Sequence, residues 1–245
     1  MARAVYLMAR WHFKPPTWAV LGMVPALALL MSLGVWQLHR GQAKELMLAH
    51  YAEAGAQAAV AFNPKQVATM QPLRVELIGN YDDQRQLLLD NQSNHQRPGY
   101  EVWTPLRLAD GTLLLVNRGW IPQSGTRAEP PSPAVPKGEQ HIVGYWRGLS
   151  EPGMRLGQAA CAKATRFPQI VNYPKVDELQ CTLGESLLNG ELLLDAAADG
   201  GFVREWNFDN GFPPTRHYGY AAQWFALALT LLAFFIKLNL KRSHD

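Results

Sequence analysis

Two long apolar runs lie near the ends of this 245-residue chain, and a more polar stretch separates them. Residues 17–38 and 218–236 contain no Asp, Glu, Lys or Arg. A helix of about 20 apolar residues spans the roughly 30 Å hydrocarbon core of a bilayer. The pattern therefore predicts transmembrane helices over 17–38 and 218–238.

The first apolar run has the features of a retained anchor. Trp18 and Trp36 lie near its two ends, where interfacial aromatic residues are expected, and membrane helices tolerate a proline such as Pro25. The alternative is a cleaved signal peptide with Ala54-Gly55-Ala56 as its cleavage site. The apolar run is too long for that, and the site lies too far downstream. We expect the anchor to be uncleaved.

The distribution of charge predicts the topology. Residues 39–217 carry 17 Lys and Arg against 19 Asp and Glu, so the net charge of +3 comes from the tails, 1–16 and 239–245, and the adjoining Lys237. Short basic tails remain in the cytoplasm, which puts both termini inside and 39–217 outside. The charge therefore marks topology and gives no indication of a nucleic-acid partner. A short N-terminal tail leaves little room for an organelle presequence, which favours a bacterial inner membrane and a periplasmic domain.

Between the two runs, the period of the hydrophobic pattern changes. Residues 39–60 are rich in helix-forming residues and predict a helical continuation of the first span. Later segments alternate polar and apolar residues like half-buried strands. Asp110-Gly111 is a tight-turn signal between two of them. A short helix is expected within 176–188, and the expected strands are 74–81, 86–90, 100–108, 112–120, 140–148, 167–173, 191–195 and 204–208.

These elements predict an α+β membrane protein. Two transmembrane helices flank a domain over 39–217 that is helical over 39–60 and β-rich over 72–210, with short antiparallel strands in a barrel-like sheet. Four prolines within 128–137 indicate an extended loop, and 151–165 shows no period and is expected to be loop as well.

The two cysteines, Cys161 and Cys181, both lie in the segment expected outside the cytoplasm. An oxidising compartment permits a disulfide between them, and the alternative is two unpaired thiols. The chain has no Cys-x-x-Cys or Cys-x-x-x-Cys motif, which argues against a thiol-based metal carrier.

The second apolar run carries a stripe of residues at helical spacing. The stripe is polar and aromatic at its start and small at two alanines, where a flat ring or another helix can approach closely. His217 at its start is either an ordinary polar helix-start residue in water or a ligand. The stripe consists of His217, Tyr220, Ala221, Trp224 and Ala228.

Residues 116–122, Val-Asn-Arg-Gly-Trp-Ile-Pro, form a second dense cluster. Two interpretations are open. In one, the segment is a hairpin strand whose Trp120 fills the core. In the other, Arg118 and Trp120 stand at a strand end and meet a planar anionic ligand or a partner protein, through the forked guanidinium and the flat indole.

Five groups of residues, in this order along the chain, resemble the SURF1 family of membrane proteins. Residues 150–205, including the cysteine pair, have no counterpart in the resemblance, and Pro214-Thr215-Arg216 differs from the polar lead that precedes the final histidine in the family. The matching groups are Trp36-Gln37-Leu38 with Arg40 and Lys44, Pro98-Gly99-Tyr100 with Thr104-Pro105-Leu106, Asp110-Gly111, Val116-Asn117-Arg118-Gly119-Trp120-Ile121-Pro122, and His217-x-x-Tyr220-Ala221-x-x-Trp224-Phe225.

The resemblance implies a non-enzymatic assembly factor for haem-copper cytochrome c oxidase. It implies binding of haem a, with His217 as ligand to the iron, and insertion of haem a into subunit I. The implied partners are subunit I, the haem a synthesis and insertion factors and membrane lipids, without nucleic acid. Tyr220 and Trp224 are candidates for packing on the haem, and Arg216, Arg40 or Arg118 for pairing with its propionates.

Alternatives for the second ligand and for the function are also open. His39, at the outer end of the first span, is a candidate second ligand. A membrane-anchored periplasmic binding or scaffold domain without haem is the alternative function, although the short tails leave no room for a cytoplasmic signalling domain. An enzyme is disfavoured because the chain has no nucleophile elbow, phosphate loop or Rossmann glycine pattern. Asp82-Asp83 and Asp177-Glu178 have the character of solvated turns.

Overall fold

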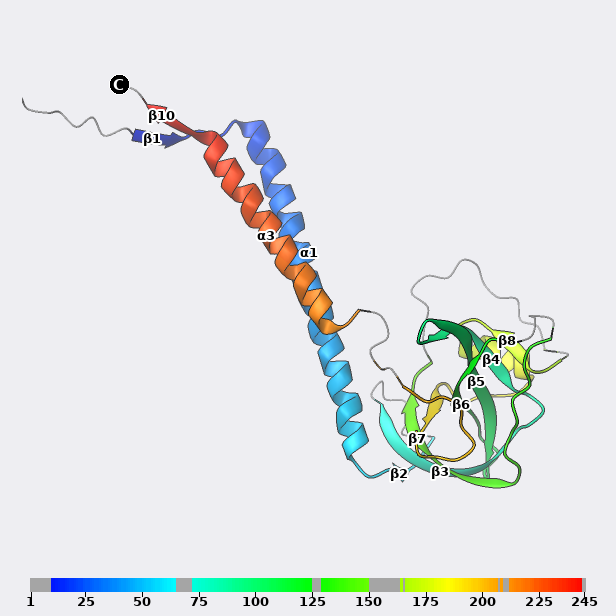
Figure 1. Cartoon of the computed structure of the whole chain (residues 1–245). Helices are drawn as coiled ribbons and strands as arrows, with labels where there is room; N and C mark the ends of the chain where they lie inside the picture. Colours follow the sequence, from blue (N-terminus) through cyan, green and yellow to red (C-terminus); the bar gives the residue numbers. More distant parts are fainter. Residues whose placement is uncertain are drawn as a thin grey trace, which may run out of the picture. The chain divides into compact units, whose positions relative to one another are not determined.

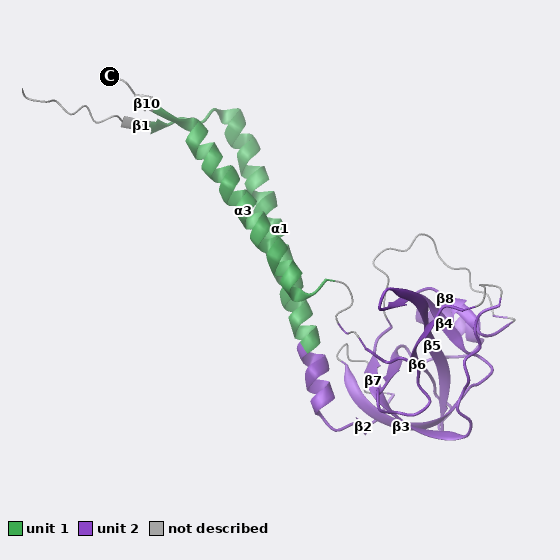
Figure 2. Cartoon of the chain, viewed as in Figure 1, with its two compact units in different colours: residues 1–48, 209–245 green, residues 49–208 purple. Residues whose placement is uncertain are grey.

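The computed structural model describes residues 10–64, 72–124, 129–149, 164, 166–206, 208 and 212–243. The chain divides into two compact units (Figure 2). The first comprises Met1–Leu48 and Asp209–Asp245, and the second is Ala49–Phe208.

Two helices make up most of the first unit and run side by side in Figure 1. Helix α1 is Thr17–Ala56, whose last turns belong to the second unit, and helix α3 is Pro214–Asn239. Both are long and apolar enough to cross a membrane. The expected first span and the helix after it are one continuous helix. Helix α3 starts before the expected residue 218, because Pro214 at its first position already has the fixed φ angle of a helix.

Helices α1 and α3 pack closely because α1 presents glycine to aromatic rings. A Cβ atom on Gly34 would lie 2.5 Å from Phe225 Cε1, and one on Gly41 would lie 2.6 Å from Tyr218 Cε1. Position 34 thus faces 225 and position 41 faces 218, which makes the two helices antiparallel. Small residues at such contacts let helix backbones approach each other.

At one end of the helix pair, the residues before α1 and those after α3 form a short ribbon that the hydrophobic pattern did not predict. Strand β1, Arg10–Phe13, pairs antiparallel with β10, Leu240–Ser243. The ring of Phe13 contacts Phe235 of α3 edge-on, with centroids 5.9 Å apart. Each strand is short and mostly polar, so alternation gives no signal. The pairing depends on the helices bringing residues from opposite ends of the chain together.

The second unit contains a mixed eight-stranded sheet with the order β2-β3-β7-β9-β6-β5-β4-β8. Strand β3 pairs with β5 as well as with β7, so β3, β7, β9, β6 and β5 form a closed ring of pairings. The elements are β2 Val60–Ala61, β3 Leu73–Tyr81, β4 Leu87–Asn94, β5 Arg97–Leu108, β6 Leu113–Pro122, β7 Glu139–Arg147, β8 Gln169–Val171, α2 Val176–Leu183 and β9 Glu191–Leu194.

The expectation of a purely antiparallel sheet was wrong. The pairs β6–β9, β4–β8 and β2–β3 are parallel. Alternation of polar and apolar residues reports which face of a strand is buried, and it carries no information on strand direction. The tight turn at Asp110-Gly111 is confirmed: the Thr112 amide donates to Asp110 Oδ1 at 2.8 Å, and Gly111 has a φ of 86°.

The strand expected over 204–208 was also wrong, since none of the described residues 204–206 and 208 lies in a strand. Val203 forms an isolated bridge with Trp120. Beyond it, side chains hold the segment in place of a backbone ladder. Arg204 donates to the carbonyl oxygens of Asp195 and Ala198, and Trp206 Nε1 donates to Leu194 O at 2.8 Å.

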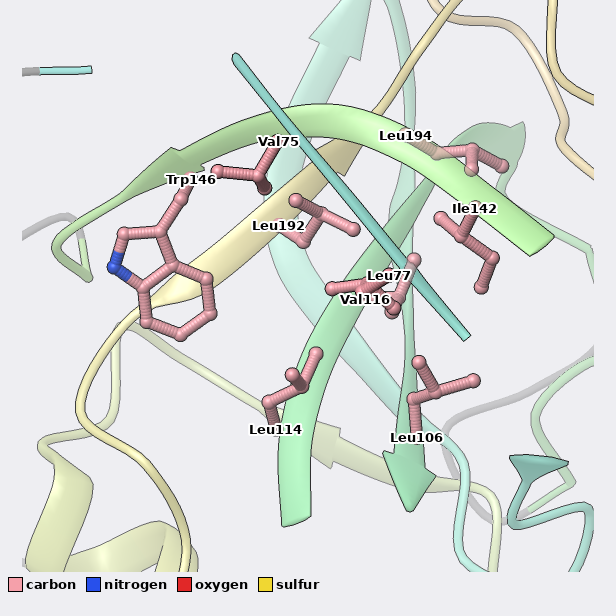
Figure 3. Packing of buried hydrophobic residues seen from close by; sticks show 9 residues of the cluster. All are labelled: Val75, Leu77, Leu106, Leu114, Val116, Ile142, Trp146, Leu192 and Leu194. Carbon is pink, nitrogen blue, oxygen red and sulfur yellow. The ribbon is translucent and has the colours of Figure 1, made fainter. Parts of the chain in front are cut away.

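The core of the second unit lies inside the ring of strands. Figure 3 shows nine side chains from β3, β5, β6, β7 and β9 that converge on this space, and each is at most 6% exposed. A second cluster on the other face of β4, β5 and β6 includes Leu179 and Leu183 of α2, packed with Trp103. The first cluster consists of Val75, Leu77, Leu106, Leu114, Val116, Ile142, Trp146, Leu192 and Leu194.

Candidate functional site

His217 lies in the first turn of α3 and is half-buried. Its Nδ1 atom is 2.8 Å from Oε1 of Gln37 on α1. A carboxamide oxygen accepts hydrogen bonds and donates none, so Nδ1 carries the proton and donates it to Gln37. In a neutral imidazole the other nitrogen, Nε2, then keeps its lone pair. The contact with α1 thus leaves His217 with a nitrogen that is able to bind a metal.

Aromatic rings and a guanidinium lie next to this imidazole. The ring of Phe212 meets His217 and Tyr220 edge-on, with both centroid distances 6.4 Å. The Arg216 guanidinium carbon lies 5.3 Å from the centre of the Phe212 ring. Tyr220 is 42% exposed, and Arg216 is exposed as well. The start of α3 therefore presents an accessible aromatic surface with a cation at its edge.

The rest of the stripe divides into two parts. Ala221 and Ala228 are 1% and 2% exposed and lie on the side of α3 that faces α1. The small residues therefore accommodate the neighbouring helix, as one of the two expectations for them had it. Trp224 is half-buried on the flank of the same stripe. The structure brings His217, Tyr220 and Trp224 onto one side of α3, as expected from their spacing.

Helix α1 contributes a face to the site that the hydrophobic pattern did not identify. Tyr218 donates its hydroxyl proton to Glu45 Oε2 at 2.8 Å, next to the contact of Gly41 with the Tyr218 ring. Gln37, Gly41 and Glu45 recur every four residues, so they form one stripe of α1. That spacing was the available signal. Phe212, which precedes α3, carried no periodic signal because it lies outside the helix.

His39 is exposed and lies on a different side of α1 from Gln37. Two residues rotate a helix by about 200°, so His39 faces away from α3 and does not approach His217. This orientation does not support a role for His39 as second ligand beside His217, and that role stays a prediction. Arg40, three residues after Gln37, lies on a neighbouring side of α1 and is also exposed.

Arg118 belongs to the second unit and is only 2% exposed. Its Nε donates to Gly200 O at 2.8 Å, a second guanidinium nitrogen donates to the same oxygen, and a third contacts Thr104 Oγ1 at 3.4 Å. Its guanidinium carbon lies 5.3 Å and 4.9 Å from the ring centres of Tyr81 and Phe202. Its donors and faces are thus directed into the domain. The expectation that Arg118 meets a ligand at an open strand end is corrected by this burial, which favours the structural interpretation.

Trp120 lies on the same strand and is half-buried. Its backbone exchanges hydrogen bonds with Val203, at 2.7 and 3.2 Å. A Cβ atom on Gly99 would lie 2.4 Å from the Trp120 indole. The glycine of the Pro98-Gly99-Tyr100 motif is therefore required to let the indole lie on β5, which again favours a structural role.

A row of polar side chains crosses β5, β6, β9 and β7 in the second unit. Asn117 Nδ2 donates to Glu101 Oε2 at 2.7 Å and to Glu191 Oε2 at 3.1 Å, and Arg147 Nε donates to Glu191 Oε1 at 2.9 Å. Burial, together with the charge of Glu191, raises the pKa of Glu101 to about 7. Interactions with Glu191, Tyr51 and Glu101 raise the pKa of Arg147, against the effect of burial. Within the described ranges, no group of three His, Cys, Asp or Glu residues is placed to hold a metal.

Cys181 lies in α2, whereas Cys161 lies outside the described residues. The expected loop over 151–165 also lies outside them, apart from Ala164. The disulfide between the two cysteines stays a prediction.

Two apolar helices of spanning length lie before and after a mixed-sheet unit in the sequence, and a histidine lies at the start of the second helix. These features describe a protein with two candidate membrane spans and a β-rich unit between them. The SURF1 family profile matches residues 24–229, and the chain belongs to the SURF1 family.

Two relatives support this assignment. The chain is 26% identical over 242 residues to a SURF1-like protein of Monosiga brevicollis, an alignment that covers 91% of this chain and 87% of that protein. It is also 26% identical over 138 residues to Surfeit locus protein 1 of Takifugu rubripes, covering 49% of this chain and 58% of that protein.

Proposed function

We propose that this chain is a cytochrome c oxidase assembly factor that binds haem a and aids its insertion into subunit I. Membership of the SURF1 family, whose members in general serve the assembly of this oxidase, supports the first part. The observation that carries the second part is the hydrogen bond of His217 Nδ1 to Gln37 at the start of an apolar helix, which leaves the lone pair of a neutral ring on Nε2. Neutral imidazole is a usual axial ligand of haem iron.

The residues around His217 fit a haem. The half-buried imidazole lies beside the exposed ring of Tyr220 and the flank of Trp224, an apolar and aromatic surface on which a porphyrin can pack. Arg216 and Arg40 are exposed and suited to pair with the propionates. When bound, the haem supplies the redox-active iron that the oxidase requires. The protein half-buries the imidazole of His217 and holds its Nδ1 atom 2.8 Å from Gln37 Oε1.

The proposed location is the bacterial inner membrane, with both termini in the cytoplasm and the β-rich unit in the periplasm. The two apolar helices and the basic tails support this arrangement. Subunit I and the factors that make and insert haem a are the proposed partners. Cysteines introduced at Lys14 and at Asp83 of the cysteine-free protein, tested with a membrane-impermeant maleimide on spheroplasts, check the topology. We expect labelling at position 83 alone.

A reduced-minus-oxidised spectrum tests the haem proposal. The full-length protein is purified from cells that make haem a, beside His217→Ala and the matched control His39→Ala. We expect a haem a signal in the wild type and in His39→Ala, and its loss in a folded His217→Ala protein. A signal that survives in His217→Ala moves the ligand elsewhere. Absence of haem from all three proteins favours the alternative, a membrane-anchored scaffold without haem.

A further inference from the structure

The contact between Gln37 and His217 has a consequence for the proposed site. We propose that Gln37 is a positioning residue: its side-chain oxygen fixes the Nδ1–H tautomer and the ring orientation of His217, so that Nε2 points to the ligand. The assignment of the ligand as haem a rests on the proposed function. The tautomer and the orientation do not, because they are properties of the protein alone.

The geometry of the pair carries this inference. The 2.8 Å distance between Nδ1 and Oε1 is a full hydrogen bond, and both side chains are half-buried. A free histidine in water exchanges between two neutral tautomers. A single oxygen acceptor at Nδ1 selects one of them. The second ring nitrogen of a metal-binding histidine commonly donates in this way to a carboxylate or carbonyl, and loss of such a partner typically weakens metal affinity 10–100-fold.

The backbone around Gln37 is held so that its side chain reaches α3. Gly34 and Gly41, three residues before and four after Gln37, bring α1 against Phe225 and Tyr218. The bond from Tyr218 to Glu45 ties the helices together again one turn further along α1. The distance between α1 and α3 is therefore fixed by contacts that lie before and after Gln37 along α1. This support distinguishes a built contact from a chance meeting of two flexible side chains.

Three variants separate the positioning role from a merely structural one. Gln37→Leu keeps the approximate volume but removes the acceptor. Gln37→Glu keeps the acceptor and adds a negative charge. Gln42→Leu is the matched control, since Gln42 is exposed on the same helix and lies about 140° around it from Gln37.

The first experiment needs no haem. Full-length protein labelled with ¹⁵N-histidine in lipid nanodiscs is compared by NMR with His217→Ala, which assigns the His217 resonances. We expect a single Nδ1–H tautomer of His217 in the wild type, in Gln37→Glu and in Gln42→Leu. Gln37→Leu is expected to show both tautomers in exchange. An unchanged tautomer in Gln37→Leu would overturn the proposal.

The second experiment titrates the same proteins with haem a and measures affinity and midpoint potential. We expect Gln37→Leu to bind about 10–100-fold more weakly and at a higher potential, because the imidazole becomes a weaker electron donor to ferric iron. Gln37→Glu is expected to bind and to lower the potential. If Gln37→Leu and wild type have equal affinity and midpoint potential while His217→Ala loses haem, the positioning role of Gln37 is rejected and the proposed function stands. A Gln37-dependent tautomer without haem binding in any protein rejects the proposed function and keeps the positioning role.

Discussion

His217 and Arg118 lie in similar sequence motifs but in different structural environments. Each lies in a motif that resembles the SURF1 family, and each is a polar residue next to aromatic ones. In the helix pair, His217 is half-buried, and its Nδ1 atom lies 2.8 Å from Oε1 of Gln37. In the β-rich unit, Arg118 is buried, and Gly200 and Thr104 take up its donors. A motif therefore identifies a position, and burial together with bonding partners decides what the residue does.

The strongest test of this contrast is Arg118→Gln. Loss of a buried, charged donor leaves Gly200 O without its partner, and we expect the free energy of unfolding to fall by about 3–4 kcal/mol. Urea unfolding of the full chain in detergent, followed by near-ultraviolet circular dichroism, measures this. The matched control is Arg97→Gln, because Arg97 is exposed on β5, and its effect should stay within about 0.5 kcal/mol. An Arg118→Gln protein of normal stability that fails to bind haem a would show that Arg118 serves ligand binding, like His217, and not the stability of the fold.

The next largest effect is the pH dependence caused by Glu101. Its pKa in the folded protein, about 7, lies above the unfolded value near 4.5, so the folded state binds the proton more tightly. The stabilisation is complete below about pH 4.5 and is lost as the pH rises through about 7, with a total of about 3 kcal/mol. Glu101→Gln should flatten the stability profile of the β-rich unit between these limits. A wild-type profile that rises with pH in this window, with the rise absent in the variant, would contradict the assignment.

Close packing of the helix pair predicts a smaller effect at Gly41. A methyl group there would meet the Tyr218 ring at 2.6 Å, so we expect Gly41→Ala to destabilise the helix pair by about 1–2 kcal/mol. Gly22→Ala is the matched control, since, among the described residues and apart from its own helix backbone, nothing lies within 4 Å of the added Cβ. It should be neutral or slightly stabilising. Unfolding in sodium dodecyl sulfate, followed by tryptophan fluorescence, compares the two. Equal effects would mean that α1 and α3 do not pack through Gly41.

The smallest expected effect concerns Glu185 on the surface of the β-rich unit. Arg107 and Arg85 hold its pKa at about 2, through bonds of 2.6 Å and 2.9 Å. The lowered pKa means that this stabilisation is present above about pH 4.5 and is lost as the pH falls through about 2. Because the side chain is about one-third exposed, we expect Glu185→Gln to cost less than about 1 kcal/mol at pH 7. About 1 M salt should reduce the difference further. A larger, salt-independent loss would show that this ion pair acts as a buried one.

The sequence predicted well those features that depend on local composition. The charge-free runs predicted the two long helices, and alternation located most strands, including β3, β6 and β7. Strand direction was not predictable in the same way, because the parallel pairing of β6 with β9 depends on which distant strands meet. The same limit applied to the site. Gln37 belonged to a matching motif, yet its contact with His217 joins residues 180 positions apart.

The ribbon formed by β1 and β10 restricts how α1 and α3 can slide along each other, because strands and helices have different repeat lengths. Residues in an α-helix advance about 1.5 Å each and repeat in turns of about 5.4 Å, whereas an antiparallel ladder repeats about every 6.8 Å. Leu240 follows directly on the last residue of α3, so β10 moves with that helix. A slip of α3 along α1 by one helical turn would therefore break the hydrogen-bond register between β10 and β1. Only one alignment satisfies both scales. The pairing of β1 with β10 therefore favours the alignment in which His217 lies opposite Gln37, near the other end of α3.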